Sequence, residues 1–265
     1  MTSVKDLSSF LVGIKTFTQL EKKLADLPSD KQKGDLFELF CQVYLKVIYK
    51  KQAFKSIHLF KDIDATTLAK LNLRLGKDYG IDIVATTDLD DIWTIQVKFR
   101  QSDQLTWTEL STFRASSEKA NFTMAMSNVS KINHPHAILN DFSSILRNEF
   151  EALTEEDFSN IKSTLKGQSI KQTVFSPRPH QIEAVQSALN HFKTNNLGQM
   201  IHACGTGKTL TSLWIKEALK PKNTIIYVPS LSLLKQTLEE WTKHKSSNFS
   251  IKCVCSDQSV SRTAQ

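Results

Sequence analysis

Residues 78–100, DYGIDIVATTDLDDIWTIQVKFR, decide the fold of the first part of the chain. Apolar and polar side chains alternate over residues 93–99, which is typical of a strand with one buried face. The run before it puts Ile81, Ile83 and Ala85 on one side and Asp82 on the other. The polar cluster TDLDD between the two runs predicts a hairpin. Pairing of the strands lets three polar side chains share a face as a possible metal and phosphate site: Asp82, Gln96 and Lys98.

The chain has 265 residues, which is enough for two modest domains. Its net charge of +7 and its pI of about 9.1 make a polyanion such as nucleic acid a plausible partner. No apolar run approaches the ~18 residues that a membrane span needs, and the first residues lack the apolar core of a signal peptide. The four cysteines form no zinc-type CxxC pair. We therefore predict a protein of the reduced, cytoplasmic compartment.

Several elements are predicted for the first part of the chain. The stretch KGDLFELFCQVYLKVIYKK (33–51) has a continuous apolar stripe and predicts an amphipathic helix. The other expected elements are a helical lead-in to about residue 30, strands near 56–60 and at 122–128, helices at 107–120 and from about Ala137, and a polar connector at 150–172. This order of strands and helices favours an α/β fold.

The pattern changes after about residue 173. A helix at 179–193, an apolar strand ending in a glycine loop, a second helix, the strand NTIIYVP (223–229) and a helix at 231–242 follow one another. Such alternation predicts a parallel α/β sheet. We place the domain boundary near residue 160, give or take ten residues, so that the expected domains are 1–160 and 161–265.

The polar face of the hairpin has the residue types that phosphodiester hydrolysis requires. That reaction uses a divalent cation to polarise the phosphate and a further positive charge near the developing negative charge. Asp82 supplies a hard oxygen ligand for Mg²⁺, and the Gln96 side chain and the Val97 carbonyl can add neutral oxygens. Lys98 can orient the water or stabilise the phosphorus centre, and Glu38 can complete the site from its helix. The simpler alternative is a surface ion pair of Asp82 and Lys98, worth less than ~1 kcal/mol.

Three other candidates are set aside. Asp78 lies near Asp82 in the sequence, but GKDYG is typical of an exposed turn. His134 and His136 flank a proline, which favours a surface loop over a metal site. Asp257 stands alone in VCSDQS and is interpreted as a loop residue.

The order KGDLFELF…GKDYGIDIVA…IQVKFR resembles the Mrr-like branch of the PD-(D/E)xK nucleases over about residues 31–135. The resemblance implies a restriction-endonuclease-like mixed sheet flanked by helices and Mg²⁺-dependent cleavage of double-stranded DNA. It also implies a catalytic set of Glu38, Asp82, Gln96 and Lys98. Gln96 stands where the wider superfamily has Glu or Asp, which leaves one fewer negative charge around the metal.

The stretch MIHACGTGKTLTSLW (200–214) is a phosphate-binding motif. Glycines let the backbone turn its N–H groups toward a phosphate, the lysine reaches the β- and γ-phosphates, and the threonine hydroxyl can bind Mg²⁺. The residues expected to bind ATP here are Gly205, Thr206, Gly207, Lys208 and Thr209. His202 occupies the place of the first glycine of the full pattern, so the match is to a looser, helicase-type loop.

Two flanking segments resemble superfamily 2 helicases. PRPHQIEAV (177–185) places Gln181 where those enzymes have an adenine-recognising glutamine. IIYVPSLSLLKQTLEEW (225–241) resembles their motif Ia, which holds a nucleic-acid backbone, with Ser230, Ser232 and Gln236 as candidate contacts. The residues after Thr209 contain no DEAD/DExH box and no second lobe. We therefore expect ATP binding without efficient hydrolysis.

A Mrr-like nuclease followed by a superfamily 2 motor resembles the N-terminal part of the type ISP restriction–modification enzymes. This resemblance implies that the remainder of the motor, a DNA methyltransferase and a target-recognition domain follow in a longer protein. The C-terminal SVSRTAQ lacks a packing element, as a truncated fragment would. A stand-alone defence or repair helicase–nuclease and a non-catalytic DNA-binding fragment remain as alternatives.

Overall fold

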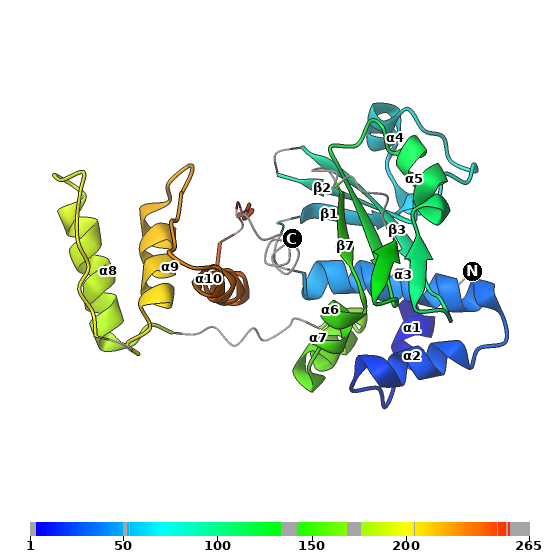
Figure 1. Cartoon of the computed structure of the whole chain (residues 1–265), viewed down its shortest axis with the longest axis horizontal. Helices are drawn as coiled ribbons and strands as arrows, with labels where there is room; N and C mark the ends of the chain where they lie inside the picture. The colour runs from blue at the N-terminus through cyan, green and yellow to red at the C-terminus, as the bar shows by residue number, and fades with distance from the viewer. Residues whose placement is uncertain are drawn as a thin grey trace. The chain divides into compact units, whose positions relative to one another are not determined.

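The computed structural model of the chain divides into two compact units, Met1–Ile170 and Lys171–Gln265 (Figure 1). The structure describes residues 4–49, 52, 54–88, 90–133, 142–168, 176–203, 205–247, 249–252 and 254. The predictions made for Cys204, Cys253, Cys255, His134, His136 and Asp257 lie outside these residues. No helix in the described ranges is long and apolar enough to span a bilayer.

Three helices open the first unit: α1 (Val4–Phe10), α2 (Phe17–Ala25) and α3 (Asp30–Val47). The Ser29 hydroxyl accepts a hydrogen bond from the Gln32 N–H and so caps α3, which therefore begins earlier than the apolar stripe alone predicts. The stripe is buried as expected, with Phe37, Phe40 and Cys41 fully inaccessible to solvent. The predicted helical lead-in and amphipathic helix are confirmed.

A mixed five-stranded sheet forms the centre of the first unit, in the order β1-β2-β3-β5-β7. Its strands are β1 (Phe54–Leu59), β2 (Ile83–Thr87), β3 (Ile92–Lys98), β5 (Phe122–Ser127) and β7 (Phe142–Ile145). The first three strands are antiparallel neighbours, and β3, β5 and β7 run parallel. A separate two-stranded sheet pairs β4 (Gln104–Thr106) with β6 (Lys131–Asn133), and η1 (Phe60–Asp62) and η2 (Thr108–Leu110) are short 3-10 turns. The predicted hairpin and the mixed sheet flanked by helices are confirmed.

Both faces of the central sheet are covered, so the prediction of a single buried face was wrong. Ile95 and Val97 pack into the large core with α3, whereas Val84 and Ile92 pack into a smaller core on the other side with Phe113. The second core is formed by α4 (Ala65–Leu71) and α5 (Ser111–Ser116), which are labelled away from α3 in Figure 1. Polar side chains of β3 are consequently buried as well: Thr94 and Gln96.

Ile81 does not share a side with Ile83 and Ala85 as predicted. Ile83 lies in the large core and Ile81 in the smaller one. The reason is a shift in the ladder, because the Asp82 N–H donates to the Ile95 carbonyl although Ile95 is already paired with Ile83. Two residues of one strand therefore face one residue of the other, as in a β-bulge, which turns the following side chains.

The predicted connector at 150–172 was wrong where the structure describes it. Residues 147–165 form α6 (Arg147–Glu151) and α7 (Glu155–Leu165), and Phe150, Phe158 and Ile161 are fully buried in the large core. Thr154 and Asp157 form a capping box at the start of α7. The helix predicted from about Ala137 begins outside the described residues, and the chain is strand β7 from Phe142 to Ile145 rather than helix.

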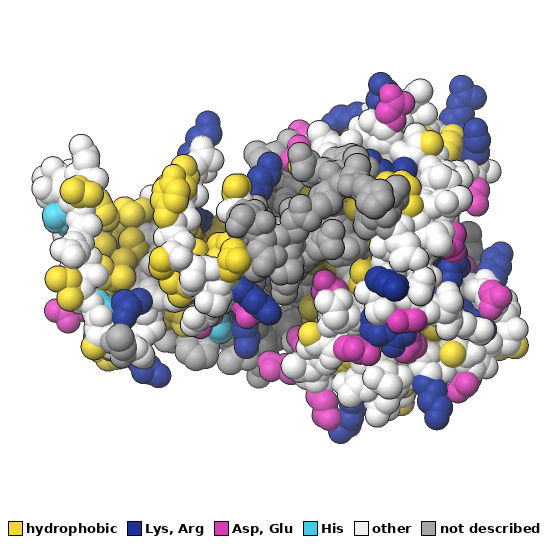
Figure 2. All heavy atoms as spheres, viewed as in Figure 1, with side chains coloured by type: hydrophobic (Ala, Val, Ile, Leu, Met, Phe, Trp, Pro, Cys, Tyr) yellow, Lys and Arg dark blue, Asp and Glu magenta, His cyan; other side chains and the backbone are white. Residues whose placement is uncertain are grey.

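The second unit contains the three predicted helices: α8 (Pro179–His191), α9 (Lys208–Leu219) and α10 (Leu231–His244). The predicted strands did not form, because no described residue between 176 and 254 belongs to a strand. Ile201, Ile225 and Tyr227 are 82%, 76% and 90% exposed. Hydrophobic side chains are accordingly prominent on the visible surface of this unit (Figure 2). An extended segment without paired neighbours cannot satisfy its backbone groups or cover its apolar side chains.

Candidate active site

Asp82 lies immediately before β2 and is held on three sides. Its own N–H donates to the Ile95 carbonyl at 3.0 Å, and its carbonyl accepts from the Phe60 N–H at 2.8 Å. Its side-chain Oδ2 accepts from the Val97 N–H at 2.6 Å. The Asp82 carboxylate thus accepts a hydrogen bond that the backbone carbonyl of a neighbouring strand would normally accept. This bond holds the carboxylate against the end of β3. Val97, predicted as a ligand through its carbonyl, contacts this group through its N–H.

Gln96 is 3% exposed, and within the described residues its Oε1 has no hydrogen-bond partner. A buried amide oxygen without a partner loses about 1–3 kcal/mol of hydration, so such atoms usually mark an ion or a water. Gly80 makes this packing possible. A Cβ at Gly80, whose φ is +68°, would lie 3.0 Å from Gln96 Nε2 and 3.3 Å from Phe113 Cβ. Sequence reasoning missed Phe113, although an apolar residue in a predicted helix was the available signal.

Lys98 is the last residue of β3 and is half-buried. Its positive charge lowers the pKa values of Asp82 and of Glu38, so it lies within electrostatic range of both carboxylates. Charge effects therefore link three residues: Glu38 of α3, Asp82 just before β2 and Lys98 at the end of β3.

Burial, with a smaller contribution from nearby negative charges, raises the pKa values of both carboxylates. Burial is the main reason why the pKa of Glu38 is raised to about 8, and the negative charge of Asp82 adds to the rise. Burial likewise raises the pKa of Asp82 to about 7, although the Val97 N–H and Lys98 favour the ionised form. A divalent cation would relieve both causes, because it supplies the missing positive charge.

The donor set suits a hard cation. Two carboxylates and one amide oxygen are oxygen ligands of the kind that Mg²⁺ prefers. No cluster of three or more His, Cys, Asp or Glu side chains able to hold a metal occurs in the described part of the chain. Any ion here would hence depend on the neutral oxygen of Gln96, on backbone groups or on water for further ligands.

Asp78 is exposed, and its Oδ1 accepts from the Gly80 N–H at 2.8 Å. This is the side-chain bond of a tight turn, as the sequence analysis expects. Asp78 is nevertheless close enough to raise the pKa of Asp82.

The phosphate-binding motif of the second unit forms a glycine-rich turn before α9. Gly205 and Gly207 have φ values of +77° and +79°, a conformation that favours glycine. The Lys208 ammonium donates to the carbonyls of His202 (3.3 Å) and Ala203 (3.0 Å). The Lys208 side chain is therefore bonded to the backbone of its own loop. It would have to leave these two carbonyls in order to bind a phosphate.

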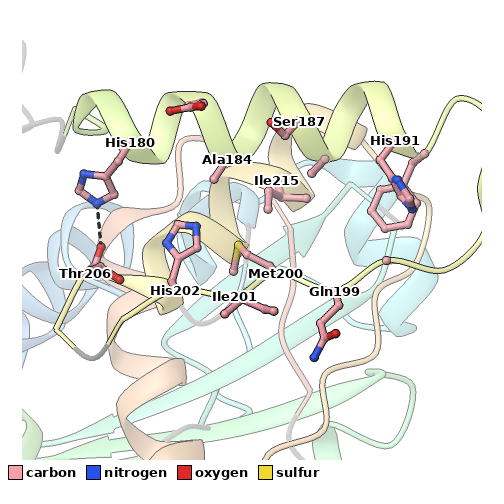
Figure 3. Close-up of a pocket in the computed structure, with 14 residues that line it drawn as sticks. His180, Ala184, Ser187, His191, Gln199, Met200, Ile201, His202, Thr206 and Ile215 are labelled. Carbon is pink, nitrogen blue, oxygen red and sulfur yellow. Dashed lines mark hydrogen bonds between the residues drawn. The ribbon is translucent and has the colours of Figure 1, made fainter.

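Gln181, which is 4% exposed, supports this loop from α8. Its Nε2 donates to the Thr206 carbonyl at 3.0 Å, and its Oε1 accepts from the Arg178 N–H at 2.8 Å. A Cβ at Gly207 would lie only 2.6 Å from Gln181 Nε2, so glycine is needed here for close approach as well as for its φ. His180 contacts the same Thr206 carbonyl at 3.2 Å (Figure 3).

A cavity of about 660 Å³ lies beside the loop, between α8 and the extended segment 198–202. Figure 3 shows His202 and Met200 on that segment pointing toward α8, whereas Ile201 between them points away from it. At the start of α10, the Ser230 hydroxyl accepts from the Leu233 N–H at 3.2 Å and acts as a helix cap. Ser232 contacts Ser230, and Gln236 is exposed.

Comparison with known protein families assigns both parts of the chain. Residues 46–169 match the family described as "Restriction endonuclease", of the Mrr-like type. Residues 174–264 match "Type III restriction enzyme, res subunit". The chain is a Mrr-like restriction endonuclease domain followed by a res-subunit helicase fragment. No curated protein matches its sequence.

A solved structure of the ATP-dependent Type ISP restriction-modification enzyme LlaBIII bound to DNA resembles this fold. The TM-score is 0.61 and the sequence identity 24%, over 93% of this chain and 15% of that chain. The endonuclease–helicase fragment thus spans 15% of the length of that enzyme.

The family match begins at residue 46, in the last turn of α3 (Asp30–Val47), so it does not include Glu38. The structure nevertheless packs α3 against β1 and β3 in the large core. The endonuclease domain as folded therefore includes the helices before residue 46.

Proposed function

We propose that the first unit is a Mg²⁺-dependent endonuclease acting on double-stranded DNA, and that the second is an ATP-binding segment of a DNA translocase. The observation that carries the nuclease proposal is the hydrogen bond from the Val97 N–H to the Asp82 carboxylate, because Val97 lies between Gln96 and Lys98 on β3. The charge coupling of Glu38 with Asp82 and Lys98 and the unpartnered buried oxygen of Gln96 support it. Two repelling carboxylates and an ammonium serve no evident packing purpose at this position, and they offer the charges that phosphate hydrolysis needs.

Each residue then has a distinct role. Glu38, Asp82 and Gln96 would hold the cation, which when bound polarises the phosphate and lowers the pKa of a water. The Val97 N–H keeps the Asp82 carboxylate oriented at 2.6 Å. Lys98 stabilises the negative charge that develops on the phosphate oxygens. Because Gln96 is neutral, the site has one fewer negative charge to attract the cation than a site with Glu or Asp at this position.

The second unit supports ATP binding through its loop. Gly205 and Gly207 have the positive φ values that such a loop uses, α9 adds its positive end, and Lys208 can reach a phosphate. Gln181 braces the turn and would lie near the base.

DNA is the proposed partner for two reasons. The resembling LlaBIII enzyme was solved bound to DNA. In addition, the whole net charge of +7 falls in residues 171–265, because residues 1–170 have equal numbers of basic and acidic side chains. We infer that the chain corresponds to the N-terminal part of a type ISP enzyme, with the remaining motor and a methyltransferase in a longer protein.

A plasmid-nicking assay tests the nuclease proposal. Supercoiled DNA is incubated with the chain in Mg²⁺, in Mn²⁺ and in excess chelator, and the parent is compared with Lys98→Ala. Lys55→Ala, which removes the same charge from an exposed position on β1, is the matched control. We expect cleavage only with metal, loss of it in Lys98→Ala and parental activity in Lys55→Ala. Equal cleavage by all three chains would overturn the assignment and favour a non-catalytic DNA-binding role.

A further inference from the structure

The strand that carries Lys98 is held at its end by side chains of the neighbouring strand. β3 and β5 run parallel, and Lys98 is paired with Ser127 at the last position of the register. The Ser127 hydroxyl, which is fully buried, donates to the Lys98 carbonyl at 2.6 Å. The backbone pairing of β3 with β5 therefore ends at Lys98, and the Ser127 side chain holds the strand at this point.

Asn128 continues this contact two residues beyond Lys98. Its Oδ1 accepts from the Arg100 N–H at 2.7 Å, and its Nδ2 donates to the Arg100 carbonyl at 2.7 Å. Asn128 is 1% exposed. One side chain thus replaces the two hydrogen bonds that a further pair of strand residues would make. Only an amide, with a donor and an acceptor side by side, can do this.

Glu21 of α2 fixes Asn128 in turn. Asn128 Nδ2 also donates to Glu21 Oε1 at 2.8 Å, and this second acceptor defines which end of the amide is nitrogen. Glu21 is itself held by the Arg147 guanidinium through bonds of 2.6 and 2.8 Å. A helix that lies outside the matched family region is therefore bonded to the end of the Lys98 strand.

We propose that Ser127 and Asn128 are positioning residues that hold the Lys98–Arg100 segment in place for DNA cleavage, and that Glu21 acts through Asn128. The inference rests on the proposed nuclease function. Strand ends open readily when few hydrogen bonds secure them. A displacement of about 1 Å in a reacting group can cost about 100-fold in rate, so a small movement of Lys98 would be measurable.

The test is the single-turnover cleavage rate of plasmid DNA at saturating enzyme, with DNA affinity and the thermal midpoint measured in parallel. Asn128→Ala is expected to lower the rate by about 10- to 100-fold. Its dissociation constant for DNA is expected to stay within about twofold of the parent, because Asn128 is buried away from any DNA. A purely structural role would instead lower the fraction of folded protein, and rate and binding together.

Ser117→Ala is the matched control. It removes an equally buried hydrogen bond of β3, that from Thr94 Oγ1 to Ser117 Oγ at 2.8 Å, but at a distance along the strand from Lys98. We expect this variant to lower the thermal midpoint less than Asn128→Ala does, because one hydrogen bond is lost instead of three, and to cleave at the parental rate. Should Asn128→Ala fail to fold, Ser127→Ala gives the same comparison, with a smaller expected fall of about 3- to 10-fold.

A charge exchange tests the part assigned to Glu21. Asn128→Asp places a second carboxylate where Nδ2 lies 2.8 Å from Glu21, and it is expected to cleave at least as poorly as Asn128→Ala. Adding Glu21→Gln to it restores a donor and an acceptor across the contact with residue 21 but leaves the Arg100 carbonyl without its donor, so part of the lost rate should return. No recovery in the double variant would remove Glu21 from the proposal.

The outcomes separate the two levels of inference. If Lys98→Ala is inactive but Asn128→Ala cleaves like the parent or like Ser117→Ala, the positioning role is wrong and the nuclease function stands. If the parent chain does not cleave with any metal, the proposed function fails and the positioning role fails with it.

Discussion

The two units bury their apolar side chains to very different extents. In the first, helices cover both faces of a mixed sheet, and the large core contains five fully buried phenylalanines: Phe17, Phe37, Phe40, Phe150 and Phe158. In the second, the described core consists of Leu210, Leu213 and Trp241 between α9 and α10. Its extended segments leave Ile225 and Tyr227 in solvent. The first unit is thus organised by strand pairing between distant parts of the sequence, and the second mainly by local helices.

The two units also differ in net charge. The first unit is electrically balanced, and its site depends on a few buried charges close together. The second holds the entire positive excess, spread over its surface. Buried charges act specifically over short distances, whereas exposed ones attract polyanions at long range and are screened by salt. We therefore expect catalytic defects from single changes in the first unit and graded binding defects in the second.

The largest effect is expected from Asp82→Asn in the first unit. This change keeps an acceptor for the Val97 N–H but removes the charge that would hold the cation, so cleavage should fall by about 1,000-fold or more. The measurement is the nicking rate in Mg²⁺, with the exposed hairpin residue changed in Asp88→Asn as the control. A rate within tenfold of the parent would show that Asp82 does not bind the cation.

Core truncation compares the stability of the units directly. Phe158→Ala should cost about 4 kcal/mol in the first unit, where its ring is fully buried among other aromatic rings. Leu213→Ala should cost about 2 kcal/mol, the low end for its type, because few buried neighbours surround it. Urea unfolding should show two transitions, with the second unit melting first. One cooperative transition, shifted equally by both variants, would contradict the division.

The pH dependence of stability should belong to the first unit. The pKa values of Glu38 and Asp82, about 8 and about 7, lie above the ordinary values of 4.5 and 3.8. The folded chain therefore retains protons that the unfolded chain has lost. This contribution to stability is full below about pH 4 and is lost as the pH rises through 7 and 8.

Without metal, the free energy of unfolding of the first unit should fall by roughly 2 kcal/mol between about pH 5 and pH 8, after allowance for solvent screening. Added Mg²⁺ should restore it at the higher pH. Asp82→Asn should flatten the dependence and stabilise the metal-free chain at pH 8, while Asp88→Asn should leave it unchanged. A metal-free parent that is more stable at pH 8 than at pH 5 would contradict the cited pKa directions.

The smallest expected effect lies in the second unit. Lys208→Ala removes the side chain expected to reach the phosphates, and should weaken ATP binding by about tenfold, or about 1.4 kcal/mol. Lys222→Ala, an exposed lysine after α9, is the control. Equilibrium binding of a fluorescent ATP analogue measures the difference. Identical affinities in the parent and Lys208→Ala would count against a phosphate-binding loop.

Local signals in the sequence predicted the helices well. The apolar stripe of α3, the Pro179 start of α8, the glycines before α9 and the Ser230 cap of α10 are each contained in a few neighbouring residues. The hairpin of β2 and β3 was predictable for the same reason, since its alternation and its turn are close in sequence. The contact between Asp82 and the Val97 N–H follows from that hairpin.

Features that depend on distant packing were not predictable. Burial of Gln96 results from α4 and α5 covering the second face of the sheet, which no pattern within β3 reveals. The acidic segment TEED (154–157) led to the prediction of a polar connector where α7 begins, although Phe158 and Ile161 have helical spacing. The strands of the second unit were predicted from apolar runs that alternate with helices, and a strand forms only where partners supply its hydrogen bonds.

The exposed segments 197–203 and 223–228 have a practical consequence for work with this chain. Apolar extended backbone with free edges can pair with the same segment of another molecule, and such pairing leads to aggregation. We expect concentration-dependent association through these segments of the second unit. The first unit would enter the aggregates while still folded. Preparations kept dilute should therefore retain more nuclease activity per molecule than concentrated ones, with no change in the nuclease itself.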